Sequence, residues 1–129
     1  AANASFGAPR MFEPDLQECL DRVDGARLVA IMGRDGLPLG WLARSDLAPE
    51  SEELLAEYSA IMRRIQTAAE HLELGPLGEV SIEAGHLLTL LRPLDSSYYL
   101  AMVLEPEGNL GLARYLLKAK APEILAELG

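Results

Sequence analysis

Gly33-Arg34-Asp35-Gly36 predicts a turn between two β-strands, because the residues on either side of it have the pattern of strands. Residues 27–32 and 37–44 are mostly apolar, and Asp-Gly between two such runs is among the strongest signals for a β-hairpin. A tight two-residue loop requires positive φ angles, which glycine adopts at little cost. We therefore predict two antiparallel strands that meet at this turn.

Amphipathic helical patterns stand on both sides of the hairpin. Before it, a short helix is expected between Pro14 and Gly25, with apolar residues at i, i+3, i+4 and i+7. After it, apolar residues at helical spacing run from Leu54 to Leu72, and the Gly75-Pro76 dipeptide ends this long helix. A second apolar seam at heptad spacing makes the stripe of the long helix wider than one sheet face requires.

Three more strands and a last helix follow. Residues 79–83 alternate strictly, whereas residues 87–91 and 98–104 are apolar on both faces, so helices are expected to cover both sides of the sheet. Asn109 is the expected cap of the last helix. Pro122 is expected to interrupt that helix and to leave one more short helical piece.

These lengths predict an α/β (α+β) fold with three layers, α/β/α. The hairpin and the three-strand meander combine into a five-stranded antiparallel sheet when the buried first strand lies beside the buried fifth. The resulting order is 2-1-5-4-3, with the Pro-containing second strand and the short third strand as edges. The long helix is expected on one face, and the N- and C-terminal helices are expected on the other.

Composition and charge narrow the classes of function. The 129 residues suit one domain, and half of them are hydrophobic, so a packed core is expected. Twenty acidic against eleven basic side chains give a net charge of −9, which opposes binding to nucleic acid and to anionic membranes. Residues 1–10 are expected to be a disordered tail or an expression remnant, and residues 11–129 to form the domain. One cysteine, no signal pattern and no membrane-spanning run indicate a cytoplasmic protein.

Catalytic and cofactor motifs are missing from the sequence. It contains no phosphate-binding loop, no dinucleotide fingerprint and no nucleophile elbow, and we expect neither enzyme activity nor a cofactor. His71 and His86 lack the further ligands that a metal site needs. Cys19 on a helical apolar stripe and Trp41 on a strand face are each more consistent with core packing than with a reactive thiol or an exposed anchor.

A few charged residues are candidates for binding a partner. Arg34 at the hairpin tip is placed as an arginine finger would be, although a solvated turn residue is commoner there. On the long helix, Arg63 and Arg64 could meet an acidic partner, with Glu57 on the same exposed side, or could simply pair with nearby glutamates.

The order of these elements resembles the Roadblock (dynein light chain Roadblock) family, in particular small bacterial proteins related to the Mgl-type polarity regulator of gliding motility. The resemblance covers residues 11–120. It rests on the Asp35-Gly36 hairpin with Leu37-Pro38, the long helix, the meander, and Tyr99-Leu100-Ala101 leading to Asn109-Leu110-Gly111-Leu112-Ala113-Arg114. The family has no catalytic residues of its own to transfer.

The resemblance implies a dimer in which two sheets join edge to edge and two long helices lie side by side. It also implies binding to a small Ras-like GTPase, as activator, scaffold or regulator. Independently, an open short edge strand and an over-wide helical stripe favour one isologous interface. The residues expected in this homodimer interface are Tyr58, Met62, Ile65, Glu79, Val80, Ser81, Ile82 and Glu83.

Two other functions stay open at this point. The chain could be an adaptor or structural subunit of a larger complex without a nucleotide-dependent partner. It could also be a small-ligand sensor, which would require a sizeable apolar pocket with convergent polar groups inside the protomer.

Overall fold

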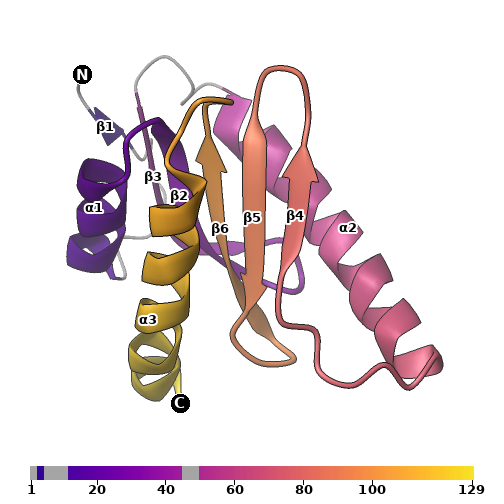
Figure 1. Ribbon diagram of the computed structural model, residues 1–129. Helices are drawn as coiled ribbons and strands as arrows, with labels where there is room; N and C mark the ends of the chain where they lie inside the picture. The colour runs from indigo at the N-terminus through magenta and orange to yellow at the C-terminus, as the bar shows by residue number, and fades with distance from the viewer. Residues whose placement is uncertain (1–2, 5–11, 45–49) are drawn as a thin grey trace.

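A computed structural model describes residues 3–4, 12–44 and 50–129, and it places one antiparallel sheet between two layers of helices (Figure 1). The elements in chain order are β1 (Asn3–Ala4), α1 (Glu13–Arg22), β2 (Ala26–Gly33), β3 (Pro38–Arg44), α2 (Ser51–His71), β4 (Val80–Glu83), β5 (Leu88–Pro93), β6 (Tyr98–Leu104) and α3 (Leu110–Leu128).

The predicted sheet topology is confirmed. The strand order is β1-β3-β2-β6-β5-β4, so the five expected strands lie in the order 2-1-5-4-3. The sequence did not indicate the two-residue strand β1, which pairs with Ala43 and Arg44 at one end of β3. The second expected strand is therefore not an edge at these two residues, because β1 covers them. This strand lies within the expected tail, of which residues 1–2 and 5–10 fall outside the described residues.

The two faces of the sheet carry separate cores, as the three-layer prediction requires. α1 and α3 cover one face, where Leu20, Ile31 and Leu116 are among the buried residues. α2 crosses the other face diagonally (Figure 1). Its buried side chains pack in one core with Trp41 and Tyr99. Trp41 is therefore a core residue, as expected.

The predicted hairpin has a three-residue loop rather than the expected two-residue loop. Gly33 N–H donates to the Leu37 carbonyl at 2.9 Å, and Gly36 N–H donates back to the Gly33 carbonyl at 3.0 Å. Gly36 alone in this loop has a positive φ, of 89°. A turn followed by a left-handed glycine is the common three-residue solution, because it needs one positive φ where a primed two-residue turn needs two.

Replacing Gly36 with alanine should therefore lower the free energy of unfolding by about 1 kcal/mol. A Cβ at this position would meet no atom closer than 3.9 Å, so the cost comes from the backbone conformation rather than from a clash. Gly78→Ala is the matched control, since a Cβ there meets nothing within 4 Å and no positive φ is involved. Equal urea-denaturation midpoints for the two variants would contradict this account.

Two boundaries differ from the expectations. The third expected strand begins at Val80 rather than at Glu79, because Val80, opposite Leu91, is the first residue that pairs with β5. The last helix is capped by Asn109 as predicted, with its Oδ1 accepting from Leu112 N–H at 3.1 Å. However, α3 continues through Pro122, because Ile124 in the next turn is buried in the core and holds that turn in place.

Candidate interaction surface

β4 is one of the two edge strands of the described sheet, because it pairs with β5 alone. Val80 and Ile82 point towards the α2 side and are half-buried against its core. Ser81 and Glu83 are exposed. The four residues thus present one apolar and one polar row beside an open edge.

The register of the β4–β5 turn shows which backbone groups face this open edge. Ala84 N–H donates to the Leu87 carbonyl at 3.0 Å, so the backbone of Ala84 faces β5. Backbone direction alternates along a strand, so Val80 and Ile82 also face β5. The amides and carbonyls of Ser81 and Glu83 consequently face outward, where another strand could pair with them.

Glu79, just before β4, forms an ion pair with Arg114 of α3 in which one guanidinium nitrogen contacts both carboxylate oxygens. Arg114 Nε lies 2.8 Å and 3.0 Å from the two carboxylate oxygens of Glu79, and this pairing raises the Arg114 pKa. The two residues are 35 positions apart, and no local pattern in the sequence connects them. The contact fastens β4 to α3 and neutralises one of the two edge glutamates.

The inner face of α2 is occupied within the protomer. Met62 is 1% exposed and Tyr58 is 8% exposed, so both pack between helix and sheet and leave almost no surface for a second chain. Tyr58 also hydrogen-bonds Thr89, and Ser59 hydrogen-bonds Tyr99, which ties α2 to β5 and β6. No pattern in the sequence indicates these two contacts.

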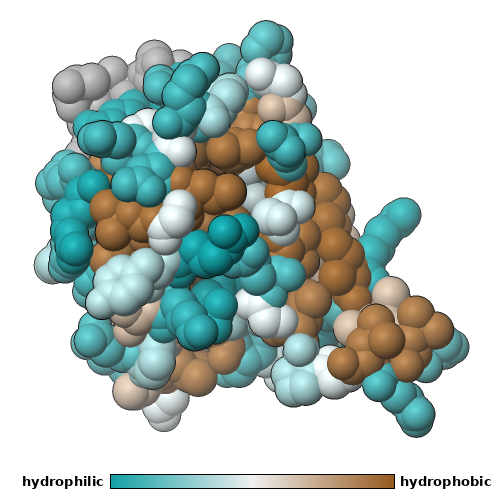
Figure 2. Space-filling view, viewed as in Figure 1, coloured by the Kyte–Doolittle hydropathy of each residue, from teal (hydrophilic) through white to brown (hydrophobic). Residues whose placement is uncertain are grey.

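The outer face of α2 carries the candidate partner-binding residues. Glu57, Ile61 and Arg64 lie at i, i+4 and i+7, which places them on one stripe, and all three are exposed. Ile65 is half-buried beside this stripe. Figure 2 shows hydrophobic surface on the β4 side of the molecule and at the C-terminal end of α2, where Leu72 and Leu74 are exposed.

The hairpin tip and α2 meet through the other two candidates. An Arg63 guanidinium nitrogen donates to the backbone carbonyl of Arg34 at 2.8 Å. The Arg34 amide in turn donates to the Ser97 carbonyl at 2.7 Å. Arg34 and Arg63 therefore lie together, whereas Glu57 and Arg64 occupy the outer face of the helix.

Metal and membrane sites have no support in the described part of the chain. His71 and His86 are both exposed, and residues 3–4, 12–44 and 50–129 contain no cluster of three metal-ligating side chains. Among the described helices, none combines the length and apolarity needed to cross a bilayer.

Cys19 is buried as predicted, beneath an ionic cluster that links α1 to α3. Lys120 Nζ lies 3.0 Å from Asp15 and 3.0 Å from Glu18, and the Lys120 hydrogen bond lowers the Glu18 pKa. Burial raises the pKa of the Cys19 thiol to about 11. The thiol is consequently protonated, and unreactive, at neutral pH.

The raised thiol pKa predicts a loss of stability at high pH. In the unfolded chain the thiol titrates near 8.5, and in the folded chain near 11, so the unfolded state releases its proton first. The contribution of the thiol to the free energy of unfolding is complete at pH values below its pKa in the unfolded chain. It declines by up to about 3 kcal/mol as the pH rises to its pKa in the folded chain. Urea denaturation of the wild type and of Cys19→Ala between pH 7 and 11 measures this difference. Parallel curves for the two proteins would contradict it.

Comparison with solved structures identifies relatives of the whole domain. MglC from Myxococcus xanthus is 30% identical, with a TM-score of 0.66, and the match covers 90% of this chain and 98% of MglC. A Roadblock/LC7 domain from Streptomyces avermitilis superposes with a TM-score of 0.79 at 17% identity, over 91% of this chain and 97% of that one. The gliding protein MglB from Thermus thermophilus gives 0.76 at 18% identity, over 91% and 89%. No protein-family model matches the chain, and no curated protein sequence does either.

Proposed function

Because the chain belongs to the Roadblock family and is related within it to the Mgl-type proteins, we propose that it is a non-catalytic regulator or scaffold of a small Ras-like GTPase and acts as a homodimer. One relative, MglB, is a gliding protein, and MglB has also been solved in a tetrameric arrangement. By analogy, the process served by this chain is cell polarity or gliding motility. The observation that carries the proposal is the open edge of β4 beside the outer face of α2.

The backbone of β4 supports a sheet that continues into a second copy. The outward amides and carbonyls of Ser81 and Glu83 are a row of unsatisfied pairing groups, and edge strands of this kind pair readily with another chain. A twofold axis perpendicular to the sheet through Ser81 would make one antiparallel sheet of the two protomers. Each protomer would contribute the same patch, which is the defining property of an isologous interface.

The charges at this edge are compatible with such pairing. With the axis through Ser81, Glu79 lies opposite Glu83 of the partner subunit, and two like charges directly opposite would destabilise the sheet. Arg114 reduces this repulsion, because its guanidinium already neutralises the Glu79 carboxylate. We therefore expect Arg114 to favour self-association.

α2 supplies the second part of the proposed dimer interface. Val80 and Ile82 point to the α2 side, so joining two β4 edges brings the two α2 helices together on the same face. Tyr58 and Met62 are already buried, so the contact between helices falls to the half-buried Ile65 and the exposed Ile61. These apolar side chains gain burial in a dimer.

The GTPase would then meet the exposed charges of α2. Arg64 and Glu57 lie on the outer stripe, and Arg63 and Arg34 lie together at the hairpin end. The sequence contains no phosphate-binding loop motif, and a net charge of −9 opposes the binding of a free triphosphate. Any effect on a nucleotide is therefore expected to pass through the partner protein.

Binding to a Ras-like GTPase from the same genome tests this proposal. The immobilised wild-type chain should retain the GTPase, with unequal recovery in the GTP-analogue and GDP forms. Arg64→Glu should reduce recovery and make it less sensitive to salt, because a charge at the rim of an interface acts mainly on encounter. Lys118→Glu on α3 is the matched control for an altered surface cation, and it should change recovery little.

An adaptor subunit without a nucleotide-dependent partner is the second candidate. It is favoured by the exposed Leu72 and Leu74 at the end of α2, which are 66% and 71% exposed. Equal recovery of the GTPase in both nucleotide states, or no recovery at all, would favour this second reading.

A further inference from the structure

A cavity of about 300 Å³ lies between the C-terminal half of α2, the segment that leads to β4, and the β5–β6 turn. Ala69, Leu77 and Leu94 supply an apolar wall. A second cavity of about 410 Å³ lies between the hairpin tip and the same β5–β6 turn, and Arg34 lines both. An open pocket with an apolar wall, adjoining a more polar one, is therefore present at this end of the sheet.

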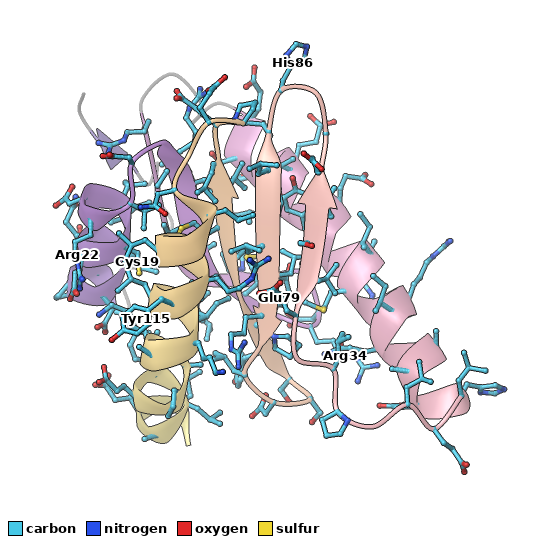
Figure 3. All side chains as sticks on the ribbon, viewed as in Figure 1. Cys19, Arg22, Arg34, Glu79, His86 and Tyr115 are labelled. Atoms are coloured by element: carbon cyan, nitrogen blue, oxygen red, sulfur yellow. The ribbon has the colours of Figure 1, made fainter. Side chains whose placement is uncertain are left out.

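Arg34 is the cation shared by the two cavities. Figure 3 shows its side chain beneath β4, between α2 and the segment that leads from α2 to β4. Within the described residues, the Arg34 guanidinium forms no hydrogen bond and no ion pair, although the residue is half-buried. An unpaired guanidinium offers two parallel donors to a carboxylate.

Gln66 lines the same cavity and has an unpaired hydrogen-bond acceptor, whereas Arg34 has unpaired donors. Its Oε1 atom is buried and accepts no hydrogen bond from any described residue. Glu70 lies one helical turn further along α2, so the amide oxygen and the carboxylate of these two residues share one face of the helix. Both groups are acceptors, and an ammonium group satisfies acceptors of this kind.

The walls of the site are held by hydrogen bonds that do not use these groups. The Arg34 amide donates to the Ser97 carbonyl at 2.7 Å, and Arg63 donates to the Arg34 carbonyl at 2.8 Å. Asp95 Oδ1 accepts from the amides of Ser97 and Tyr98 at 2.7 Å and 2.9 Å, which fixes the β5–β6 turn. These contacts hold the hairpin tip and the β5–β6 turn in place, and one oxygen of the Asp95 carboxylate is used within its own turn.

We propose that this cavity binds a free α-amino acid with an apolar side chain. The carboxylate pairs with the Arg34 guanidinium, the α-ammonium group lies between Gln66 Oε1 and the Glu70 carboxylate, and the side chain packs on Ala69, Leu77 and Leu94. A zwitterion fits better than a simple anion, because it has no net charge to be repelled by a chain of charge −9. The volume of about 300 Å³ suits a ligand of this small size.

Calorimetric titration of the purified full chain with L-leucine and L-phenylalanine tests the proposal. Saturable binding is expected with at least one of them. Leucinamide lacks the carboxylate and N-acetyl-leucine lacks the ammonium group, and each should bind at least about tenfold more weakly, since each leaves a charged group of the site unpaired. A Kd of roughly 1 mM is the weak end of specific binding. If neither amino acid gives heat at concentrations up to about 10 mM, the proposal is wrong.

Two variants separate a specific site from a general effect. Arg34→Ala keeps the backbone contacts of the hairpin and should weaken leucine binding at least about tenfold, whereas Lys118→Ala, on the opposite face of the sheet, should leave it unchanged. Gln66→Leu removes the unsatisfied acceptor, so it should raise the Tm of the free chain by about 2–5 °C and abolish the further rise caused by leucine. Undiminished leucine binding by either Arg34→Ala or Gln66→Leu would overturn the assignment. The inference concerns one protomer, so it stands or falls separately from the GTPase proposal.

Discussion

Ser81→Pro is expected to convert the protein from a dimer to a monomer without unfolding the protomer. The Ser81 amide faces the open edge of β4, so proline removes a donor to the partner strand and none to β5. Because the interface is twofold, the dimer loses two hydrogen bonds, one from each protomer. Together they cost about 2–3 kcal/mol, which is roughly a 30- to 150-fold rise in the dimer Kd. Sedimentation velocity across a micromolar concentration series measures this change.

Two controls make the Ser81 experiment specific. Ser81→Thr retains the amide and favours a strand, so it should remain dimeric. Ile82→Pro removes a donor that faces β5, so it should destabilise the protomer itself. If the wild type sediments as a monomer at micromolar concentration, the edge-to-edge dimer is wrong.

Met62→Ala should lower the free energy of unfolding by about 2–5 kcal/mol. Met62 is 1% exposed and lies in the core between α2 and the sheet, so truncation leaves a cavity there. Ile65→Ala, three residues further along, removes a half-buried side chain and should cost only about 1 kcal/mol within the protomer. Urea denaturation at one fixed protein concentration compares the two variants, because dimer stability depends on concentration.

The contrast between these two positions also concerns self-association. Ile65→Ala should raise the dimer Kd more than its small effect on the protomer would suggest, if α2 meets α2. An effect of Met62→Ala below about 0.5 kcal/mol, the size typical of surface positions, would be incompatible with the packing of α2 described above.

The sequence predicted those parts of the fold whose causes are local. Asp35-Gly36 located the hairpin, alternation located β4, and Asn109 located the start of α3. The predicted length of the hairpin loop was wrong, because an Asp-Gly pair suits two kinds of loop. A two-residue loop needs two positive φ angles, and the observed three-residue loop needs one. The break at Pro122 was wrong because the burial of Ile124 depends on the sheet beneath it, which no helical pattern reports.

The surface was less predictable, because long-range contacts decide which side chains are free. Tyr58, Met62 and Ile65 recur on one helical stripe, yet only the sheet determines that the first two are buried and the third is partly available. Similarly, Glu79 and Arg114 are remote in sequence, and so are Arg34 and Gln66. The cavity that these last two line depends on three segments meeting in space.

Calorimetric titration of a Ras-like GTPase from the same genome into the wild-type chain tests whether the chain is a GTPase regulator. We expect saturable heat with the GTPase in one nucleotide state, GTP-analogue or GDP, at a stoichiometry defined by the dimer, and clearly weaker binding in the other state. Magnesium-GTP titrated into the chain without the GTPase should give no heat. Saturable micromolar binding of magnesium-GTP by the chain itself, or no binding of the GTPase in either state, would show that the chain is not a regulator of this kind.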